Sequence, residues 1–427
     1  MEFKISPAKR LSGSITLPGD KSISHRAIML SSVADGTSRI RNFLYSDDTD
    51  ITIAAFCSMG IKIEHAKNEV IINGQGLSGL SKPELYLSMG NSGTTMRILM
   101  GILAGQNFQV ILTAEESLSR RPMRRVTEPL SAMGAIIVGK DDANYAPITI
   151  QGGKLRAIDY VSKVASAQVK SAILLAGLYA DGTTSVTEPS KSRDHTELML
   201  KAYGAKISVD GLKVSVGGGA KLEGQQIDIP GDISSAAFFI VGASILKGSS
   251  IVLKSVGINP TRTGIMDILN MMGAKIKIEN IKEVASELLG DICVESSDLH
   301  GVTIEGDLIP RAIDELPIIM VAAAYANGMT IIKGVEELKV KETDRVNSMV
   351  TNLNNMDAMC SVEGDRIIIE GSKFLKGEMV RSFGDHRTAM SMAIAGLAAQ
   401  SETTIDDIDC VAKSYPDFTK DLQSLLK

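Results

Sequence analysis

The sequence contains no tryptophan, and only 4% of its 427 residues are aromatic. A core dominated by large rings is therefore excluded, and the interior must be built from Ile, Leu, Val, Met and Ala. Hydrophobic residues make up 44% of the chain. A chain of this length is too long for one ordinary core, and this composition is sufficient for two.

Cysteine is also scarce, with only Cys57, Cys293, Cys360 and Cys410. Their spacing matches no metal-binding pattern, so we expect reduced, mostly buried thiols and no metal site. The first five residues form a β-like segment without a basic, apolar leader, and no apolar run has the length needed to span a bilayer. These absences predict a cytoplasmic protein that binds no membrane.

The sequence lacks both an excess of positive charge and a complete nucleotide motif. A formal net charge of −5 argues against binding to nucleic acid. Residues 74–79 fit the dinucleotide fingerprint, but Lys82 and Pro83 stand where its phosphate-binding helix should run. Residues 19–22 resemble the end of a P-loop, with Asp20 interrupting it. We expect neither NAD nor ATP as a cofactor.

What the sequence does contain is an internal repeat of a β segment, a turn, a helix of small residues, a break and a second β segment. Residues 27–37 and 172–183 are two similar copies, and further helices start near Met96, Ala236, Leu316 and Thr388. The spacing of roughly 65 to 80 residues indicates small α/β subdomains, since solenoid repeats are shorter.

A second marker, an apolar residue followed by glycine, occurs near the end of several copies. Each glycine is predicted to end a helix at positive φ, with an edge strand after it. Asp357 takes the place of the glycine in a fifth copy. The four glycines are Gly60, Gly134, Gly204 and Gly273.

Charged and hydroxyl residues gather at two places in each copy. The first loop precedes the small-residue helix, and the second loop follows the next strand. Capping explains Ser and Asp in a first loop, but not Lys21 and Arg26, because the helix dipole disfavours cations there. A single charge run would be a solvated face, whereas loops charged in nearly every copy predict a site for a small, highly anionic ligand. The first loops are residues 18–27, 89–97, 165–168, 232–235, 313–316 and 384–387, and the second loops are 46–48, 120–123, 192–195, 261–263, 339–345 and 413–414.

Six copies would divide into two domains of three. Pro18-Gly19-Asp20 and Pro230-Gly231-Asp232 are similar tripeptides between a strand and a helix, and we take them as the crossovers. The prediction is one domain of residues 1–20 with 232–427 and another of residues 21–231. The loops would then face a cleft that holds the active site.

The loop motifs together resemble the EPSP synthase family, the 3-phosphoshikimate 1-carboxyvinyltransferases within the enolpyruvyl transferases. The resemblance covers essentially the whole chain, and its motifs occur in the family's order. They are residues 18–26, 90–94, 121–123, 314–317, 341–345, 384–387 and 412–416.

The resemblance implies an α/β fold of two inverse α/β barrels built from six βαβαββ repeats. It implies transfer of the enolpyruvyl group of phosphoenolpyruvate to the 5-hydroxyl of shikimate 3-phosphate, a step of the shikimate pathway toward chorismate and the aromatic amino acids. No metal or organic cofactor is expected. The expected partners are the two substrates and the inhibitor glyphosate, and we predict a monomer.

The resemblance also assigns the site residues. Shikimate 3-phosphate would be held by Lys21, Ser22, Arg26, Ser166, Ala167, Gln168, Asp314 and Lys341. Phosphoenolpyruvate would be held by Lys21, Gly93, Arg121, Gln168, Arg345, Arg387 and Lys413. The catalytic residues would be Asp314 as general base, with Glu342 or Lys21 as proton donor. A structural alternative is that Asp314 caps a helix and Glu342 pairs with Lys341.

Two departures and two rival functions accompany this resemblance. Ala167 stands where many relatives have a second Ser, and the role of Arg193 and His195 is open. The UDP-N-acetylglucosamine enolpyruvyltransferases usually carry a Cys near the phosphoenolpyruvate-binding Arg, but no Cys lies near Arg121. A non-catalytic anion-binding repeat protein would have little reason to keep Asp314 and Glu342.

Overall fold

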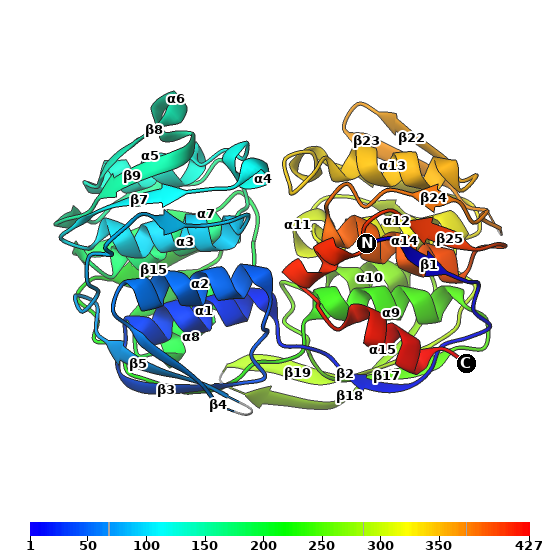
Figure 1. The fold of residues 1–427 in the computed structure, drawn as a ribbon, viewed down its shortest axis with the longest axis horizontal. Helices are drawn as coiled ribbons and strands as arrows, with labels where there is room; N and C mark the ends of the chain where they lie inside the picture. The colour runs from blue at the N-terminus through cyan, green and yellow to red at the C-terminus, as the bar shows by residue number, and fades with distance from the viewer. Residues whose placement is uncertain (67–68, 285, 373) are drawn as a thin grey trace. The chain divides into compact units, whose positions relative to one another are not determined.

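The structure is a computed structural model that describes residues 1–66, 69–284, 286–372 and 374–427. These residues form two compact units, coloured along the chain in Figure 1. The N-terminal unit contains Gly19–Ile229 and Val284–Glu287, and the C-terminal unit contains Met1–Pro18, Pro230–Glu283 and Leu288–Lys427. The chain therefore passes from one unit to the other between Pro18 and Gly19 and between Ile229 and Pro230, and Val284–Glu287 belongs to the N-terminal unit although the segments on either side belong to the C-terminal unit.

The N-terminal unit alternates helices with short strands. Its helices are α1 (Lys21–Ser32), α2 (Asp47–Ser58), α3 (Gly93–Ala104), α4 (Glu116–Ser119), α5 (Arg124–Met133), α6 (Lys140–Ala143), α7 (Ala167–Gly177) and α8 (His195–Ala202). Its strands are β3 (Asp35–Arg41), β4 (Lys62–Ala66), β5 (Glu69–Gln75), β6 (Leu87–Ser88), β7 (Gln109–Thr113), β8 (Ile136–Gly139), β9 (Tyr145–Gln151), β10 (Leu155–Arg156), β11 (Asp159–Val161), β12 (Ala180–Asp181), β13 (Thr183–Thr187), β14 (Ile207–Asp210), β15 (Lys213–Gly217) and β16 (Gln226–Asp228).

The C-terminal unit has the same alternation and includes the first two strands of the chain. Its helices are α9 (Ile233–Ile245), α10 (Gly264–Met271), α11 (Leu308–Ala312), α12 (Leu316–Tyr325), α13 (Arg345–Asn355), α14 (His386–Leu397) and α15 (Phe418–Leu425), with the 3-10 helices η1 (Glu336–Leu338) and η2 (Asp409–Lys413). Its strands are β1 (Phe3–Ile5), β2 (Ser12–Thr16), β17 (Ser250–Gly257), β18 (Lys275–Val284), β19 (Glu287–Glu295), β20 (Thr303–Ile304), β21 (Met329–Lys333), β22 (Met359–Glu363), β23 (Arg366–Glu370), β24 (Met379–Val380) and β25 (Thr403–Ile405).

The sheets repeat one topology, as the internal repeat predicts. Within the described residues the four-stranded sheets have the orders β16-β3-β5-β4, β6-β7-β9-β8, β11-β13-β15-β14, β2-β17-β19-β18 and β20-β21-β23-β22. In each of them the first pair of strands is parallel, as in β6 with β7, and the second pair is antiparallel, as in β7 with β9. A smaller sheet joins β1, β25 and β24.

The glycine marker has the predicted geometry. Gly60, Gly134, Gly204 and Gly273 all have positive φ, between 88° and 117°. Asp357, in the fifth copy, also has positive φ, at 66°. Glycine suits this conformation because it has no Cβ to clash with the backbone. The strands that follow these residues, β4, β8, β14, β18 and β22, are all at the edges of their sheets, which confirms the prediction.

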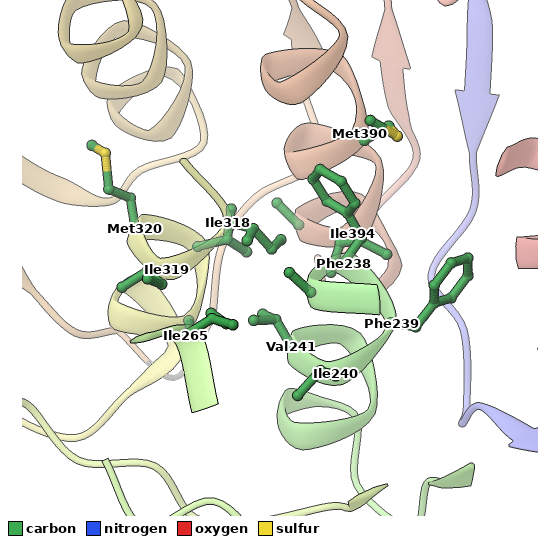
Figure 2. Close-up of a cluster of buried hydrophobic side chains, with 14 of the residues drawn as sticks. Phe238, Phe239, Ile240, Val241, Ile265, Ile318, Ile319, Met320, Met390 and Ile394 are labelled. Atoms are coloured by element: carbon green, nitrogen blue, oxygen red, sulfur yellow. The ribbon is translucent and has the colours of Figure 1, made fainter. Parts of the chain in front are cut away.

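Each unit has its own aliphatic core, as the composition predicts. In the C-terminal unit the centre consists of α9, α12 and α14, and Figure 2 shows side chains such as Phe238, Ile318 and Ile394 pointing toward one another. Nearly every residue of these helices is buried, which explains why α12 is apolar all round and why the polar residues of α9 and α14 are few and lie mostly in the first turn. In the N-terminal unit, α3 and α7 lie so close that a Cβ on Gly101 would be 2.1 Å from the carbonyl oxygen of Ala172.

The four cysteines differ in burial. Cys360 and Cys410 are buried, Cys293 is partly buried and Cys57 is exposed near the end of α2, so the expectation of mostly buried thiols holds for two of the four. None of the described helices is long and apolar enough to cross a membrane.

Candidate active site

The first loop of the first copy places a cation against a carboxylate. Asp20 caps α1, because its Oδ1 accepts a hydrogen bond of 2.9 Å from the backbone N–H of Ile23. Lys21 begins the helix, and its Nζ lies 2.9 Å from Oδ2 of Asp48. Asp48 belongs to the second loop of the same copy. This carboxylate offsets the unfavourable position of a cation at the positive end of a helix.

Arg26 lies one turn further along α1 and is buried. Its guanidinium donates from Nε to Oγ1 of Thr196 at 2.7 Å, from NH2 to Oγ of Ser171 at 2.8 Å, and from NH1 to the carbonyl of Ser22 at 2.9 Å. Thr196 and Ser171 are absent from the site expected from sequence. The only signal in the sequence is their position near the loops of the third copy, since Thr196 directly follows the second loop and Ser171 lies three residues after the first.

Two buried arginines converge on Gly93, the first residue of α3. A Cβ on Gly93 would lie 2.8 Å from NH1 of Arg121 and 2.9 Å from NH1 of Arg97. Arg97 also donates from NH1 to Oε1 of Gln168 at 3.0 Å, and the Gln168 amide donates to Thr94 at 3.0 Å. The structure therefore brings Gly93, Arg121 and Gln168 together as expected. It adds Arg97, which lies in the first loop of the second copy and has no role in the prediction from sequence.

The third copy contributes the start of α7. Ser166 is the N-cap of this helix, and its Oγ accepts from the backbone N–H of Val169 at 3.5 Å. Ala167 follows as the first residue of α7, and its side chain is a methyl group that makes no hydrogen bond. In the second loop, Nδ1 of His195 lies 2.6 Å from Oε1 of Glu287, and both side chains are buried. Sequence reasoning gave no signal for this contact, because Glu287 lies 92 residues away.

In the C-terminal unit, Asp314 lies between α11 and α12. The N-cap position of α12 is occupied by Glu315, so Asp314 is not a helix cap and that alternative is wrong. The Asp314 carboxylate is 3.3 Å from Arg345 NH1, 3.7 Å from Arg387 NH2 and 3.8 Å from Lys341 Nζ. Three cations therefore surround this one carboxylate.

Arg345 is the most buried of these cations, with a side chain only 1% exposed. It donates to Asp385 at 2.8 Å, to Glu342 at 2.6 Å and to Asp314 at 3.3 Å. Burial opposes its charge, but the carboxylates of Asp385, Glu342 and Asp314 outweigh burial and raise the pKa of Arg345 above its ordinary value. Arg345 is therefore permanently charged. Its contact with Glu342 differs from the pairing with Lys341 considered from sequence.

The sixth copy supplies Arg387 and Lys413. Asp385 caps α14 by accepting from the backbone N–H of Arg387 at 2.8 Å. The Arg387 side chain donates from NH1 to the carbonyl of Asp314 at 2.9 Å. Lys413 comes from η2 and donates from Nζ to the carbonyl of Gly384 at 2.8 Å. Asp385 lies in the first loop of the sixth copy, and its bond to Arg345 does not follow from the sequence.

In the fourth copy the cation comes from the second loop. Arg262 NH2 lies 3.0 Å from Oδ1 of Asp232 and 2.8 Å from Oγ of Ser234, and Ser234 also donates to Glu315. The second loop thus meets the first loop here, as it does in the Lys21–Asp48, Arg345–Asp314 and Lys413–Gly384 contacts. These contacts bring the first and second loops of each of these copies together.

The loops of each unit carry several arginine and lysine side chains, although the protein is acidic overall. Anions with several oxygens, such as phosphates and carboxylates, are the ligands that clustered arginine and lysine side chains bind best. Within the described part of the chain, no three His, Cys, Asp or Glu residues are grouped so that they could hold a metal ion.

Comparisons with known proteins agree with this chemistry. The family model described as EPSP synthase (3-phosphoshikimate 1-carboxyvinyltransferase) matches residues 5–422. The 3-phosphoshikimate 1-carboxyvinyltransferases of Bacillus anthracis (strain A0248) and Bacillus cereus (strain B4264) are each 51% identical to the chain over 427 residues, which is 100% of both chains.

A solved structure of EPSP synthase from Acinetobacter baumannii is similar to the fold, with a TM-score of 0.89 and 46% sequence identity. The match covers 100% of this chain and 98% of that one. Family model, full-length relatives and structure lead to the same result. The chain belongs to the EPSP synthase family, the 3-phosphoshikimate 1-carboxyvinyltransferases.

Proposed function

We propose that the loop residues described above bind the two substrates of an EPSP synthase and carry out its chemistry. The reaction transfers the enolpyruvyl group of phosphoenolpyruvate to the 5-hydroxyl of shikimate 3-phosphate and releases phosphate. The observation that carries the assignment is the Asp314 carboxylate with Lys341, Arg345 and Arg387 around it. A candidate base, Asp314, therefore lies within 4 Å of three cations that could bind anionic reactants.

Shikimate 3-phosphate would be bound mainly through charge-assisted hydrogen bonds. Arg26 supports this role because Ser171 and Thr196 hold its guanidinium in one orientation. Ala167 adds no hydrogen bond, so the set around this substrate is thinner than in relatives with two serines. The proposed binding residues are Lys21, Ser22, Arg26, Ser166, Ala167, Gln168, Asp314 and Lys341.

Phosphoenolpyruvate would be bound by Arg121, whose guanidinium lies beside Gly93, and by Arg345 and Arg387, which both lie near Asp314. Charge-assisted hydrogen bonds contribute about 1.5 to 3 kcal/mol each, so several could offset the repulsion between two phosphorylated carboxylates. Glyphosate would compete for this site. The proposed residues are Lys21, Gly93, Arg121, Gln168, Arg345, Arg387 and Lys413.

The proposed chemistry adds the 5-hydroxyl oxygen to phosphoenolpyruvate and then eliminates phosphate. Asp314 would remove the proton of the hydroxyl, and Glu342 or Lys21 would protonate the methylene carbon to give a tetrahedral intermediate. Loss of phosphate and of a methyl proton then restores the double bond. Glu342 and Lys21 remain alternative proton donors. Glu342 contacts Arg345 and Lys21 contacts Asp48, so each candidate has one partner of opposite charge and neither is favoured by its contacts.

At the level of the fold, we propose that the six copies are βαβαββ repeats and that three of them form each of two inverse α/β barrels. The shared parallel and antiparallel strand order supports this assignment. The proposed domains are residues 1–20 with 232–427 and residues 21–231, and the reaction would take place in the cleft between them. We further propose a monomer that binds neither nucleic acid nor membrane.

The test is phosphate release from phosphoenolpyruvate, with shikimate 3-phosphate and UDP-N-acetylglucosamine as separate acceptors. Release only with shikimate 3-phosphate supports the proposal. Release only with the sugar nucleotide makes the chain the other enolpyruvyl transferase. Binding of shikimate 3-phosphate without release from either acceptor would indicate a binding protein that has lost its chemistry.

A further inference from the structure

The N-terminal unit contains a buried charge cluster that the proposed mechanism does not use. Lys170 on α7 places its Nζ 2.7 Å from Oε2 of Glu188 and 2.7 Å from Oε1 of Glu197 on α8. The three side chains are 1%, 3% and 5% exposed. With all three groups ionised, the cluster has one negative charge in excess.

Such a cluster is a poor source of stability. Removing ions from water costs several kcal/mol each, and apolar side chains of similar volume are often equally stabilising. Burial raises the pKa of Glu197 despite the nearby lysine, and the two carboxylates raise the pKa of Lys170 despite burial. Oε1 of Glu188 and Oε2 of Glu197 have no hydrogen-bond partner among the described residues. These features call for a role other than stability.

The position of the cluster suggests that role. Lys170 is followed directly by Ser171, and Glu197 is preceded directly by Thr196. The hydroxyls of Ser171 and Thr196 lie 2.6 Å apart, and both accept hydrogen bonds from Arg26. The ion pair between Lys170 and Glu197 therefore joins α7 to α8 at the level of the two groups that orient Arg26.

We propose that the Lys170–Glu197 ion pair is a positioning device that fixes α7 against α8 and thereby orients the Arg26 guanidinium for shikimate 3-phosphate. An ion pair with a 2.7 Å contact restricts both the distance and the register of two helices, whereas apolar packing tolerates sliding by fractions of an ångström. A shift of the two hydroxyls would turn the guanidinium and weaken its bonds to the substrate. The inference rests on the proposed role of Arg26.

The chain offers a matched pair of variants. Glu197→Met removes the link between α7 and α8 and leaves Lys170 neutralised by Glu188. Glu188→Met removes the other carboxylate and leaves the cluster with the same net charge as Glu197→Met does. It keeps the contact between Lys170 on α7 and Glu197 on α8. We expect Glu197→Met to weaken shikimate 3-phosphate binding at least tenfold, with the KM for phosphoenolpyruvate within twofold of the original. Glu188→Met should change both quantities by less than twofold.

Calorimetric titration of shikimate 3-phosphate measures binding without turnover, so it separates this inference from the proposed function. If the unaltered protein does not bind the ligand, the proposed function fails. If both glutamate variants bind it as well as the unaltered protein does, only the positioning role is overturned. Should Glu197→Met fail to fold, Glu197→Asp decides, because the shorter side chain cannot keep the contact to Lys170 with both helices in place. Unchanged affinity in that variant overturns the inference.

A double-mutant cycle tests whether the effect passes through Arg26. In an Arg26→Ala background, Glu197→Met should weaken binding by less than twofold, because there is no guanidinium left to orient. The full tenfold loss in this background would show that the cluster acts independently of Arg26, which overturns the proposal.

Discussion

A single methyl group at Gly93 should distinguish phosphoenolpyruvate from glyphosate. In Gly93→Ala the new Cβ would lie 2.8 Å from NH1 of Arg121 and 2.9 Å from NH1 of Arg97. Ordinary contact begins at 3.4 Å, so both guanidinium groups have to retreat by roughly half an ångström. The groups that must move are the ends of flexible side chains, and we therefore expect the variant to fold.

The displacement should affect binding more than stability. Arg121 and Arg97 are buried, at 9% and 5% exposed, and have limited room to move while keeping their partners. A charge-assisted hydrogen bond contributes about 1.5 to 3 kcal/mol, so its loss corresponds to roughly 10- to 100-fold in affinity. We expect the KM for phosphoenolpyruvate to rise no more than about tenfold, since its other proposed cations are unchanged. Glyphosate is proposed to compete for the same site, and if it fills the space beside Gly93 it should lose about 100-fold or more in affinity.

The assay is steady-state phosphate release at saturating shikimate 3-phosphate, with phosphoenolpyruvate and glyphosate varied together. Gly153→Ala is a suitable control, because a Cβ there meets nothing within 4 Å. It should have the kinetics and inhibition of the unaltered protein. Equal inhibition of the unaltered protein and Gly93→Ala by glyphosate would refute the reasoning.

Three further predictions concern catalysis, packing and acid stability. Alanine at Asp314 or Glu342 should lower turnover by roughly a hundredfold or more while substrate binding changes only a few fold; unchanged single-turnover rates would remove both from the mechanism. Gly101→Ala should destabilise the N-terminal unit by about 1 to 3 kcal/mol, because its Cβ would lie 2.1 Å from the Ala172 carbonyl oxygen, and an unaltered urea midpoint would contradict this. Burial lowers the pKa of His25 from its ordinary 6.5 to about 3, so the unfolded chain binds the proton more tightly and stability falls as pH drops through this window. His25→Gln should reduce that loss, by up to about 1.4 kcal/mol per pH unit; melting temperatures with the same pH slope in both proteins would refute it.

The features that could be predicted from sequence are those fixed by local chemistry. Positive φ at Gly60 and Gly134 follows from the helix-ending pattern, and the edge position of the next strand follows from the repeat. The start of α1 follows from Asp20, whose short side chain caps the helix. Each of these depends on a few neighbouring residues, and an internal repeat presents the same evidence several times.

The partners of the charged groups could not be predicted, because they depend on packing between distant segments. Arg26 and Thr196 are 170 residues apart, and nothing in either segment specifies the other. Glu342 contacts Arg345, where the adjacent Lys341 was the obvious candidate from sequence. Glu342 lies before the first residue of α13, so helical spacing does not account for this pairing, which depends on how the loop before α13 folds.

The pairing of the first two strands has a consequence for how the protein is made. Strand β2 pairs with β17 through Ser12 and Ser250, and β1 pairs with β25 through Phe3 and Ile405. At a synthesis rate of about 5 to 20 residues per second, β1 has to wait roughly 20 to 80 seconds for its partner. Nearly all of the N-terminal unit, Gly19–Ile229, emerges within that interval. It can fold on the ribosome while the oldest strand of the chain remains unpaired until almost the last residues have been added.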